Sequence, residues 1–236
     1  MGKVNLIFAR FAKKIFLHFP KTLKVPNSFR KKIIITGLPY EYRFKFDKRI
    51  ADTKERKKIL ILGGSQGAVK LNMILCKIFN NLPLEMANKI DIEMQSPKYQ
   101  SDKIKNIFAK LNIRFKTNIF YNDVLKKLNK TDILISRSGA GATSDVINTK
   151  TPTIFIPLPH SSNNHQYYNA KYLSDQNACI LINQNELEQK ESVDTIINLI
   201  NDDTLKNKFI NNLIKIEKFD SNLLILNEMK ENYKNE

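Results

Sequence analysis

Glycine is scarce in this sequence. There are seven glycines in 236 residues, about 3% of the sequence, whereas glycine makes up roughly 7% of an average protein. Apart from Gly2, they occupy three places, which are Gly37, the group Gly63, Gly64 and Gly67, and the pair Gly139 and Gly141. Each place follows a short apolar run that is typical of a buried strand. Because open α/β sheets bind ligands where their strands end, these turns are candidate binding loops.

Long apolar runs are also missing. No run approaches the ~20 residues that a membrane-spanning helix needs. Arg10, Lys13 and Lys14 interrupt the apolar residues near the N-terminus, which argues against a secretory signal. The 42% of hydrophobic residues are ample for a buried core. We therefore expect a soluble globular protein of one large domain, or one domain with an appendage.

The sequence has only two cysteines, Cys76 in a predicted helix and Cys179 in a predicted strand. We interpret both as buried thiols of a protein in a reducing cytosol, and a disulfide or a metal pair is the alternative. No metal site is expected, because His160 and His165 are a poor pair at this spacing and no acid or cysteine converges with them.

Acidic residues are absent from the first 40 residues, which contain nine lysines and arginines. The formal net charge of the whole chain is +16, and much of the rest reflects a composition rich in Lys, Asn and Ile throughout. A basic segment can bind nucleic acid. No aromatic platform or reading helix accompanies it here, so we expect no nucleic-acid partner.

Within this basic segment, residues 4–19 are predicted to form one amphipathic helix, because apolar residues recur at helical spacing with basic residues opposite. The apolar residues are Val4, Ile7, Phe8, Phe11, Ile15 and Phe16. Such a helix can attach to an anionic membrane surface or to a partner protein. The alternative is an ordinary surface helix packed on its own domain.

Predicted strands alternate with predicted helices from residue 59 onward. Strands are expected at 59–62, 90–95, 114–120, 133–136, 153–156 and 178–182, and an earlier one at 32–36. Helices are expected after the glycine loop and at 98–111, 124–128, 138–149, 164–176, 192–201, 204–218 and 222–233. This alternation predicts an α/β fold, a Rossmann-like parallel sheet with helices on both faces.

The first candidate site is the loop that begins at Gly63 and Gly64 and continues through Ser65, Gln66 and Gly67. The helix after it has unpaired N–H groups at the positive end of its dipole, which suit a phosphate. Ser65 and Gln66 could add hydrogen bonds to a phosphate or sugar. The spacing fits neither the Walker loop nor G-x-G-x-x-G, so a tight turn without a ligand is the alternative.

The second candidate site is the segment 136–145, which a predicted strand enters and a predicted helix leaves. Ser138 can cap this helix, and Gly139 lets the backbone approach a ligand. Asp145 lies two turns into the helix, where its carboxylate could accept both hydroxyls of a ribose. On the alternative interpretation Asp145 is a solvated helix residue and Arg137 is a surface charge.

The third candidate site is the segment 157–170, which is crowded with side-chain amides. Gln166 and Asn169 are three residues apart and lie on one face of the predicted helix. No G-x-S-x-G elbow is present, so a nucleophile triad has no support.

Together the three segments resemble the C-terminal domain of the MurG family, the N-acetylglucosaminyltransferases that make lipid II in peptidoglycan synthesis. The resemblance rests on Gly-Gly-Ser-Gln-Gly-Ala after a strand, Ser-Arg-Ser-Gly-Ala about seventy residues on, and Pro-x-x-His followed by Asn-His-Gln-x-x-Asn-Ala. It implies a GT-B architecture of two Rossmann-like domains, of which the C-terminal one holds UDP-N-acetylglucosamine without a metal or other cofactor. It also implies a place in the bacterial cytoplasm, on the inner membrane.

The resemblance implies roles for individual residues. Gly64, Ser65 and Gln66 in the first loop, and Arg137, Ser138 and Gly139 in the second, would hold the diphosphate or nucleotide. Asp145 would take the ribose hydroxyls, although the family usually has Glu here. Gln166 and Asn169 would take the sugar, and Gln95 with Ser96 would line the base or ribose side.

The acceptor domain of the family, with its glycine-rich loops and catalytic His, has no counterpart in this sequence. We therefore expect residues 1–36 to be the end of that domain and its connection, and residues 37–236 to be the UDP-sugar-binding domain with its C-terminal helices. The acceptor lipid I would bind through a separately supplied domain, with the base on that domain. The alternative is a UDP-sugar-binding remnant without catalysis.

Overall fold

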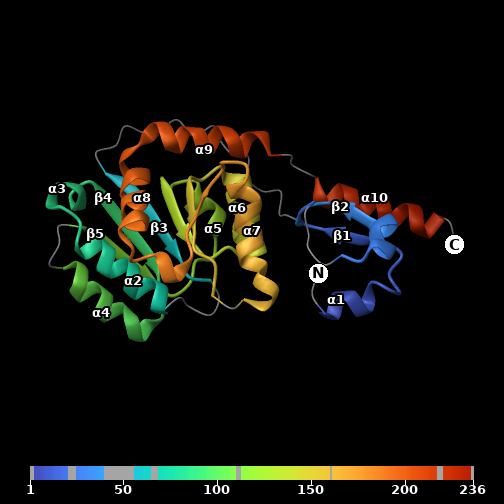
Figure 1. The fold of residues 1–236 in the computed structure, drawn as a ribbon, viewed down its shortest axis with the longest axis horizontal. Helices are drawn as coiled ribbons and strands as arrows, with labels where there is room; N and C mark the ends of the chain where they lie inside the picture. The colour runs from blue at the N-terminus through green and yellow to red at the C-terminus, as the bar shows by residue number, and fades with distance from the viewer. Residues whose placement is uncertain are drawn as a thin grey trace. The chain divides into compact units, whose positions relative to one another are not determined.

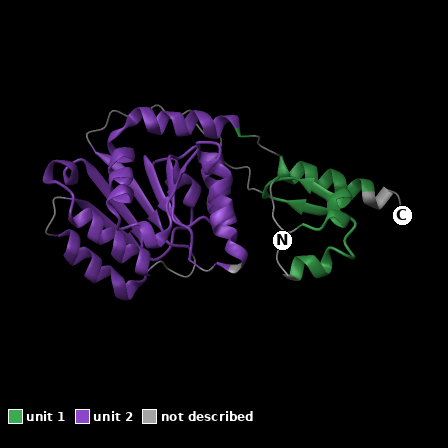
Figure 2. Cartoon of the chain, viewed as in Figure 1, with its two compact units in different colours: residues 1–45, 216–236 green, residues 46–215 purple. Residues whose placement is uncertain are grey.

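The structure is a computed structural model that describes residues 3–20, 25–39, 56–64, 69–109, 113–159, 161–216 and 220–234. The chain divides into two compact units (Figure 2). Unit 1 contains residues 1–45 and 216–236, and unit 2 contains residues 46–215. None of the helices within the described ranges is long and apolar enough to cross a membrane.

Unit 2 is built on a six-stranded parallel sheet (Figure 1). Its strands are β3 (Lys57–Leu62), β4 (Ile90–Gln95), β5 (Arg114–Asn118), β6 (Ile133–Ser136), β7 (Thr153–Phe155) and β8 (Ile180–Leu181). They are ordered β5-β4-β3-β6-β7-β8. The chain therefore adds β4 and β5 on one side of β3 and then β6, β7 and β8 on the other side. The switch point lies between β3 and β6, and the predicted Rossmann-like parallel sheet is confirmed.

Helices cover both faces of this sheet. They are α2 (Val69–Asn80), α3 (Leu84–Ala87), α4 (Lys98–Phe108), α5 (Val124–Leu128), α6 (Ala140–Thr149), α7 (His165–Ser174), α8 (Lys190–Asn201) and α9 (Asp203–Lys215), with short 3-10 turns η2 (Ser162–Asn164) and η3 (Gln184–Glu186). Side chains of α2, α4, α8 and α9 share one apolar cluster with Ile59 and Ile61 of β3. The intervening Leu60 and Leu62 are buried outside this cluster, as the alternation of side chains along a strand requires.

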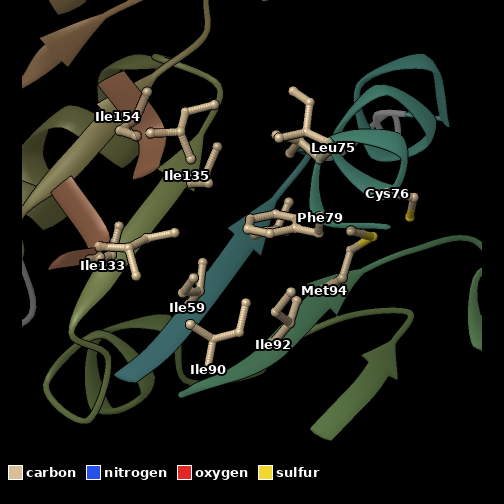
Figure 3. Packing of buried hydrophobic residues seen from close by; sticks show 14 of the residues in the cluster. Ile59, Leu75, Cys76, Phe79, Ile90, Ile92, Met94, Ile133, Ile135 and Ile154 are labelled. Carbon is tan, nitrogen blue, oxygen red and sulfur yellow. The ribbon is translucent and has the colours of Figure 1, made fainter. Parts of the chain in front are cut away.

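Phe79 of α2 lies at the centre of that cluster (Figure 3). Its ring is fully buried, and the picture places it between the aliphatic side chains of β3 and β4 and Leu75 of its own helix. Every second residue of β4 is buried, and Ile90, Ile92 and Met94 form one side of the cluster.

Unit 1 contains α1 (Lys3–Phe8), β1 (Ile15–Leu17), the 3-10 turn η1 (Asn27–Lys32), β2 (Ile33–Ile35) and α10 (Ser221–Lys234). The strands β1 and β2 pair in parallel, with Ile15 opposite Ile33 and Leu17 opposite Ile35.

The prediction of one helix over residues 4–19 is therefore wrong, because α1 ends at Phe8 and residues 15–17 form a strand. Pairing with the Ile-rich β2 satisfies the backbone of these β-branched and aromatic residues. This long-range contact overrides the local helical periodicity.

The last helix of the chain does not lie in the unit expected from a division between residues 36 and 37. α10 belongs to the same unit as the N-terminal segment. Two contacts tie it there, since the Ser221 hydroxyl donates a hydrogen bond to the Thr36 carbonyl and the Lys14 ammonium lies 3.1 Å from the Glu228 carboxylate.

Replacing Phe79 with alanine tests the described core. We expect Phe79→Ala to lower the free energy of unfolding by about 3–5 kcal/mol, because it leaves a cavity between α2 and the sheet. The exposed Tyr99→Ala is the matched control and should change it by less than about 0.5 kcal/mol. Chemical denaturation followed by circular dichroism measures both, and equal effects would contradict the packing.

Candidate functional site

The carboxyl ends of β3, β6 and β7 lie side by side at one edge of the sheet. Leu62 is opposite Ser136, and Ser136 is opposite Phe155. The pairing continues past the strand ends, since Arg137 N donates to Leu62 O at 3.2 Å and Ile156 N donates to Ser136 O at 2.8 Å. The segments that follow the three strands therefore begin next to one another. Gly37 follows β2 in the sheet of unit 1 and does not belong to this edge.

Gly64 ends the described part of the loop after β3. Its φ is +80°, a conformation that side chains with a Cβ rarely adopt, and an added Cβ would meet nothing within 4 Å. Backbone geometry rather than crowding therefore requires glycine at this position. Ser65 and Gln66 lie outside the described residues, so their predicted contacts stay predictions.

The N-terminus of α6 follows β6 at this edge. Its N-cap is Gly139, and no side chain makes a capping hydrogen bond there. A Cβ added at Gly139 or at Gly141 would meet nothing within 4 Å. The first N–H groups of α6 are thus left without a side-chain cap, at the positive end of the helix dipole, which is a suitable place for a phosphate.

Ser138 does not cap this helix, contrary to expectation. Its hydroxyl donates instead to the backbone carbonyl of Gln166 at 2.8 Å. The Asn169 side-chain Nδ2 donates back to the Ser138 carbonyl at 3.0 Å. These two bonds tie the end of β6 to the first turns of α7.

Arg137 is buried, with 7% of its surface exposed. Its Nη1 donates to the carbonyls of Ile156 and Pro157 at 3.0 Å each, and its Nη2 donates to Gln184 Oε1 at 2.5 Å. Burial lowers the pKa of the guanidinium to about 10, so it keeps its charge at neutral pH. The side chain predicted to hold a diphosphate therefore points at protein acceptors in this structure.

Gln166 and Asn169 lie together on α7, as their spacing predicts. Gln166 Oε1 accepts a hydrogen bond from Leu158 N at 2.9 Å. Ahead of this helix, Asn163 and Asn164 both have φ of 54°, a left-handed conformation that Asn tolerates better than most residues. The turn delivers the two amides beside Ser138 and the N-terminus of α6.

Asp145 lies on α6 and is partly buried. Burial raises the pKa of its carboxyl to about 6, because the charged form loses hydration. Its carboxylate makes no hydrogen bond or ion pair within the part of the chain that the structure describes. It is available to a ligand that brings hydroxyl donors.

Gln95 and Ser96 follow β4, the next strand beyond β3. Gln95 Nε2 donates to Ile119 O at 3.3 Å, and the Ser96 hydroxyl bonds to Gln100 Oε1 at 3.3 Å. Ser96 is buried, so only Gln95 retains solvent access.

Sequence reasoning missed two features of this edge. Asn72 of α2 is fully buried and donates to Gln95 O and Gln100 Oε1, at 3.0 and 3.3 Å, which links the start of α2 to the end of β4. Phe120, just past β5, is 69% exposed and offers an aromatic face on which a nucleotide base could stack. The sequence predicts a strand over 114–120, but β5 ends at Asn118, so Phe120 lies in the segment after the strand.

Comparisons with known proteins show the family to which this chain belongs. Residues 58–223 match the glycosyltransferase family 28 C-terminal domain. The chain belongs to glycosyltransferase family 28. Among its relatives in this family is the "UDP-N-acetylglucosamine--N-acetylmuramyl-(pentapeptide) pyrophosphoryl-undecaprenol N-acetylglucosamine transferase" of Rickettsia felis, which is 34% identical over 227 residues. The protein of the same name from Rickettsia bellii is 32% identical over 229 residues.

The chain spans 63% and 64% of the lengths of these two relatives, while 92% and 95% of the chain itself is covered. The crystal structure of MurG from Acinetobacter baumannii has the same fold, with a TM-score of 0.78, 23% identity, and coverage of 98% of this chain and 64% of that one. The predicted resemblance to the MurG family is thus confirmed, as is the fold of the C-terminal domain of a GT-B glycosyltransferase. In these family 28 relatives, about a third of the length has no match in this chain.

The raised pKa of Asp145 makes stability depend on pH. Because the folded pKa of about 6 lies above the unfolded value, the folded state binds the proton more tightly, and the cost of the buried charge disappears as pH falls from about 6 toward 4. We expect Asp145→Asn to raise the free energy of unfolding at pH 7.5 by roughly 1–3 kcal/mol, and by far less at pH 4.5. Denaturation at both pH values measures this.

The exposed Asp102→Asn is the control, and it should leave the pH profile unchanged. A gain for Asp145→Asn that is the same at both pH values would show that the carboxyl is not held in a desolvated place.

Proposed function

We propose that unit 2 binds UDP-N-acetylglucosamine, and that this chain is the donor-binding part of a glycosyltransferase that passes N-acetylglucosamine to lipid-linked muramyl pentapeptide. The reaction would convert lipid I to lipid II in peptidoglycan synthesis. The names of the Rickettsia relatives describe this transfer. The single observation that carries the proposal is the uncapped N-terminus of α6 beside the Gln166 and Asn169 amides at one edge of the sheet.

The chemistry of a UDP leaving group fits this edge. As the glycosidic bond breaks, negative charge develops on the diphosphate, and unpaired N–H groups at a helix N-terminus stabilise such charge. We propose that the N-terminus of α6, with the backbone at Gly64 and Gly139, supplies this stabilisation without a metal or other cofactor. Ser65 and Gln66 are proposed to add contacts from the first loop.

Asp145 is the proposed partner of the ribose hydroxyls. A deprotonated carboxylate offers both of its oxygens as acceptors to the two hydroxyls, whereas protonation turns one of these oxygens into a donor. Since the pKa of Asp145 is raised to about 6, donor affinity should weaken as the pH falls below 6. Gln95 lies one strand away from β3 and is proposed to line the base or ribose side, with Phe120 beyond it.

The acceptor site and the catalytic base are proposed to lie in a region equivalent to the third of the relatives that this chain does not match. Unit 1 supports docking of such a region. Its exposed apolar side chains are Val4, Ile7, Phe8 and Phe11 near α1 and Leu223, Leu226 and Met229 on α10. Parallel sheets are normally covered and extended, so the pair β1 and β2 would gain from further strands and helices.

An anionic membrane surface is the second proposed partner of unit 1. Phe11 is 83% exposed, and the basic Arg10, Lys13 and Lys14 adjoin it. Exposed aromatic rings next to basic residues suit a surface of anionic lipid. A peripheral position on the cytoplasmic face of the inner membrane would bring the donor site to a lipid-linked acceptor.

Calorimetry of the purified chain tests the donor site. We expect UDP-N-acetylglucosamine to bind more tightly than UDP-glucose, and Asn169→Ala to weaken the binding of UDP-N-acetylglucosamine by about tenfold because a hydrogen-bond partner of the sugar is lost. Gln176→Ala, an exposed amide just beyond the same helix, is the control and should leave the affinity unchanged. Absence of binding by both nucleotide sugars would refute the donor assignment.

A transfer assay then separates an enzyme from a remnant. The chain is mixed with the part of the Rickettsia felis relative that it does not match, a lipid I analogue and labelled UDP-N-acetylglucosamine. Labelled lipid II is the expected product. Donor binding without any transfer would leave the alternative, a UDP-sugar-binding remnant, as the function of this chain.

A further inference from the structure

We propose that Arg137 is a positioning residue of the donor site rather than a ligand of the diphosphate. By holding the carbonyls of Ile156 and Pro157, it fixes the backbone from which the Leu158 N–H sets the orientation of the Gln166 amide. This inference rests on the proposed function for the identity of the ligand, but the contacts that carry it lie within the chain.

The bonds of Arg137 leave little of its guanidinium for a ligand. Three of its five N–H groups are accounted for by the carbonyls of Ile156 and Pro157 and by Gln184 Oε1. The side chain is 7% exposed. To reach a diphosphate at the open edge, it would have to abandon three charge-assisted bonds and leave two carbonyls unpaired.

All three acceptors of Arg137 are neutral oxygens. Removing these partners would leave a buried charge uncompensated, which costs free energy. The arrangement of the groups around the guanidinium is therefore tightly determined. The loop after β7 and the turn η3 are therefore both anchored to residue 137, which itself directly follows β6. One guanidinium joins three separate segments of the chain.

The segment that Arg137 holds has a single backbone donor. Pro157 and Pro159 have no N–H, so between residues 157 and 159 only Leu158 can donate. That N–H donates to Gln166 Oε1 at 2.9 Å. A shift of the Ile156 and Pro157 carbonyls would move this donor, and with it the partner that orients the Gln166 side chain.

The orientation of Gln166 decides what it offers a ligand. With Oε1 occupied by Leu158, the Nε2 group is left to donate outward. Asn169 has the opposite polarity, because its Nδ2 donates to Ser138 O and its Oδ1 is left to accept. One donor and one acceptor on adjacent turns suit neighbouring oxygens of a sugar, one of which accepts a hydrogen bond while the other donates one.

The first experiment compares the affinities of UDP and UDP-N-acetylglucosamine by calorimetry. In Arg137→Lys the charge is kept but the planar fork is lost. We expect UDP affinity within about twofold of wild type and UDP-N-acetylglucosamine affinity lowered by about tenfold, because only the sugar contact depends on Gln166. Gln166→Glu, which can still accept from Leu158 but cannot donate from an amide, should show the same split.

A diphosphate ligand would give a different pattern. If Arg137 touched the phosphates, UDP and UDP-N-acetylglucosamine would both weaken together in Arg137→Lys, and more so in Arg137→Met. An equal loss for the two nucleotides would overturn the proposal.

The second experiment needs no ligand. Hydrogen exchange of the Leu158 amide is followed in the free chain, and we expect exchange in Arg137→Lys to be at least about tenfold faster than in wild type while core amides of β3 keep their protection. Unchanged exchange at Leu158 would overturn the proposal, whether or not the wild-type chain binds a nucleotide. Absence of nucleotide binding by the wild-type chain would refute the donor function, which is a separate result. Gln184→Leu, which removes one of the three bonds, serves if Arg137→Lys does not fold, and no acceleration there would also count against the proposal.

Discussion

Parallel pairing of β3 with β6, and of β6 with β7, determines where the chain can bind a ligand. The hydrogen bonds of these strands continue to Arg137 N and Ile156 N, so the segments after all three strands leave the sheet in register. The uncapped start of α6 and the amides of α7 are brought together by this register. Residues that are almost thirty positions apart, such as Ser138 and Gln166, thereby become hydrogen-bonded neighbours.

A second constraint acts at the same edge, where polar side chains hold the loops to one another. Arg137, Ser138, Gln166 and Asn169 all make bonds to protein groups in the free chain. In the side-chain amides of Gln166 and Asn169, one polar atom is hydrogen-bonded to the protein and the other is available. The groups available to a ligand therefore have a fixed polarity. An edge organised in this way is suited to reading hydroxyl groups, as a nucleotide sugar requires.

Much of the fold could be predicted from the sequence, because the signals in unit 2 are local. The strands at 90–95 and 133–136 and the helix at 124–128 have the predicted bounds, since apolar alternation, short apolar runs and turn residues coincide there. Unit 1 could not be predicted in this way. Its β1 depends on pairing with β2, and the place of α10 depends on contacts with Thr36 and Lys14, which are about two hundred residues away in sequence.

The candidate site was predictable in composition but less so in its contacts. Gln166 and Asn169 were correctly placed on one face of a helix next to the second loop. A motif cannot tell whether an arginine faces a ligand or the backbone, and so the burial of Arg137 was not foreseen.

The most direct test of the central claim is to map UDP-N-acetylglucosamine binding by backbone amide chemical shifts. The account predicts that the largest changes occur at Gly64, Gly139, Ala140 and Gln166, and changes confined to the opposite edge of the sheet, around Lys57 and Asp132, would contradict it.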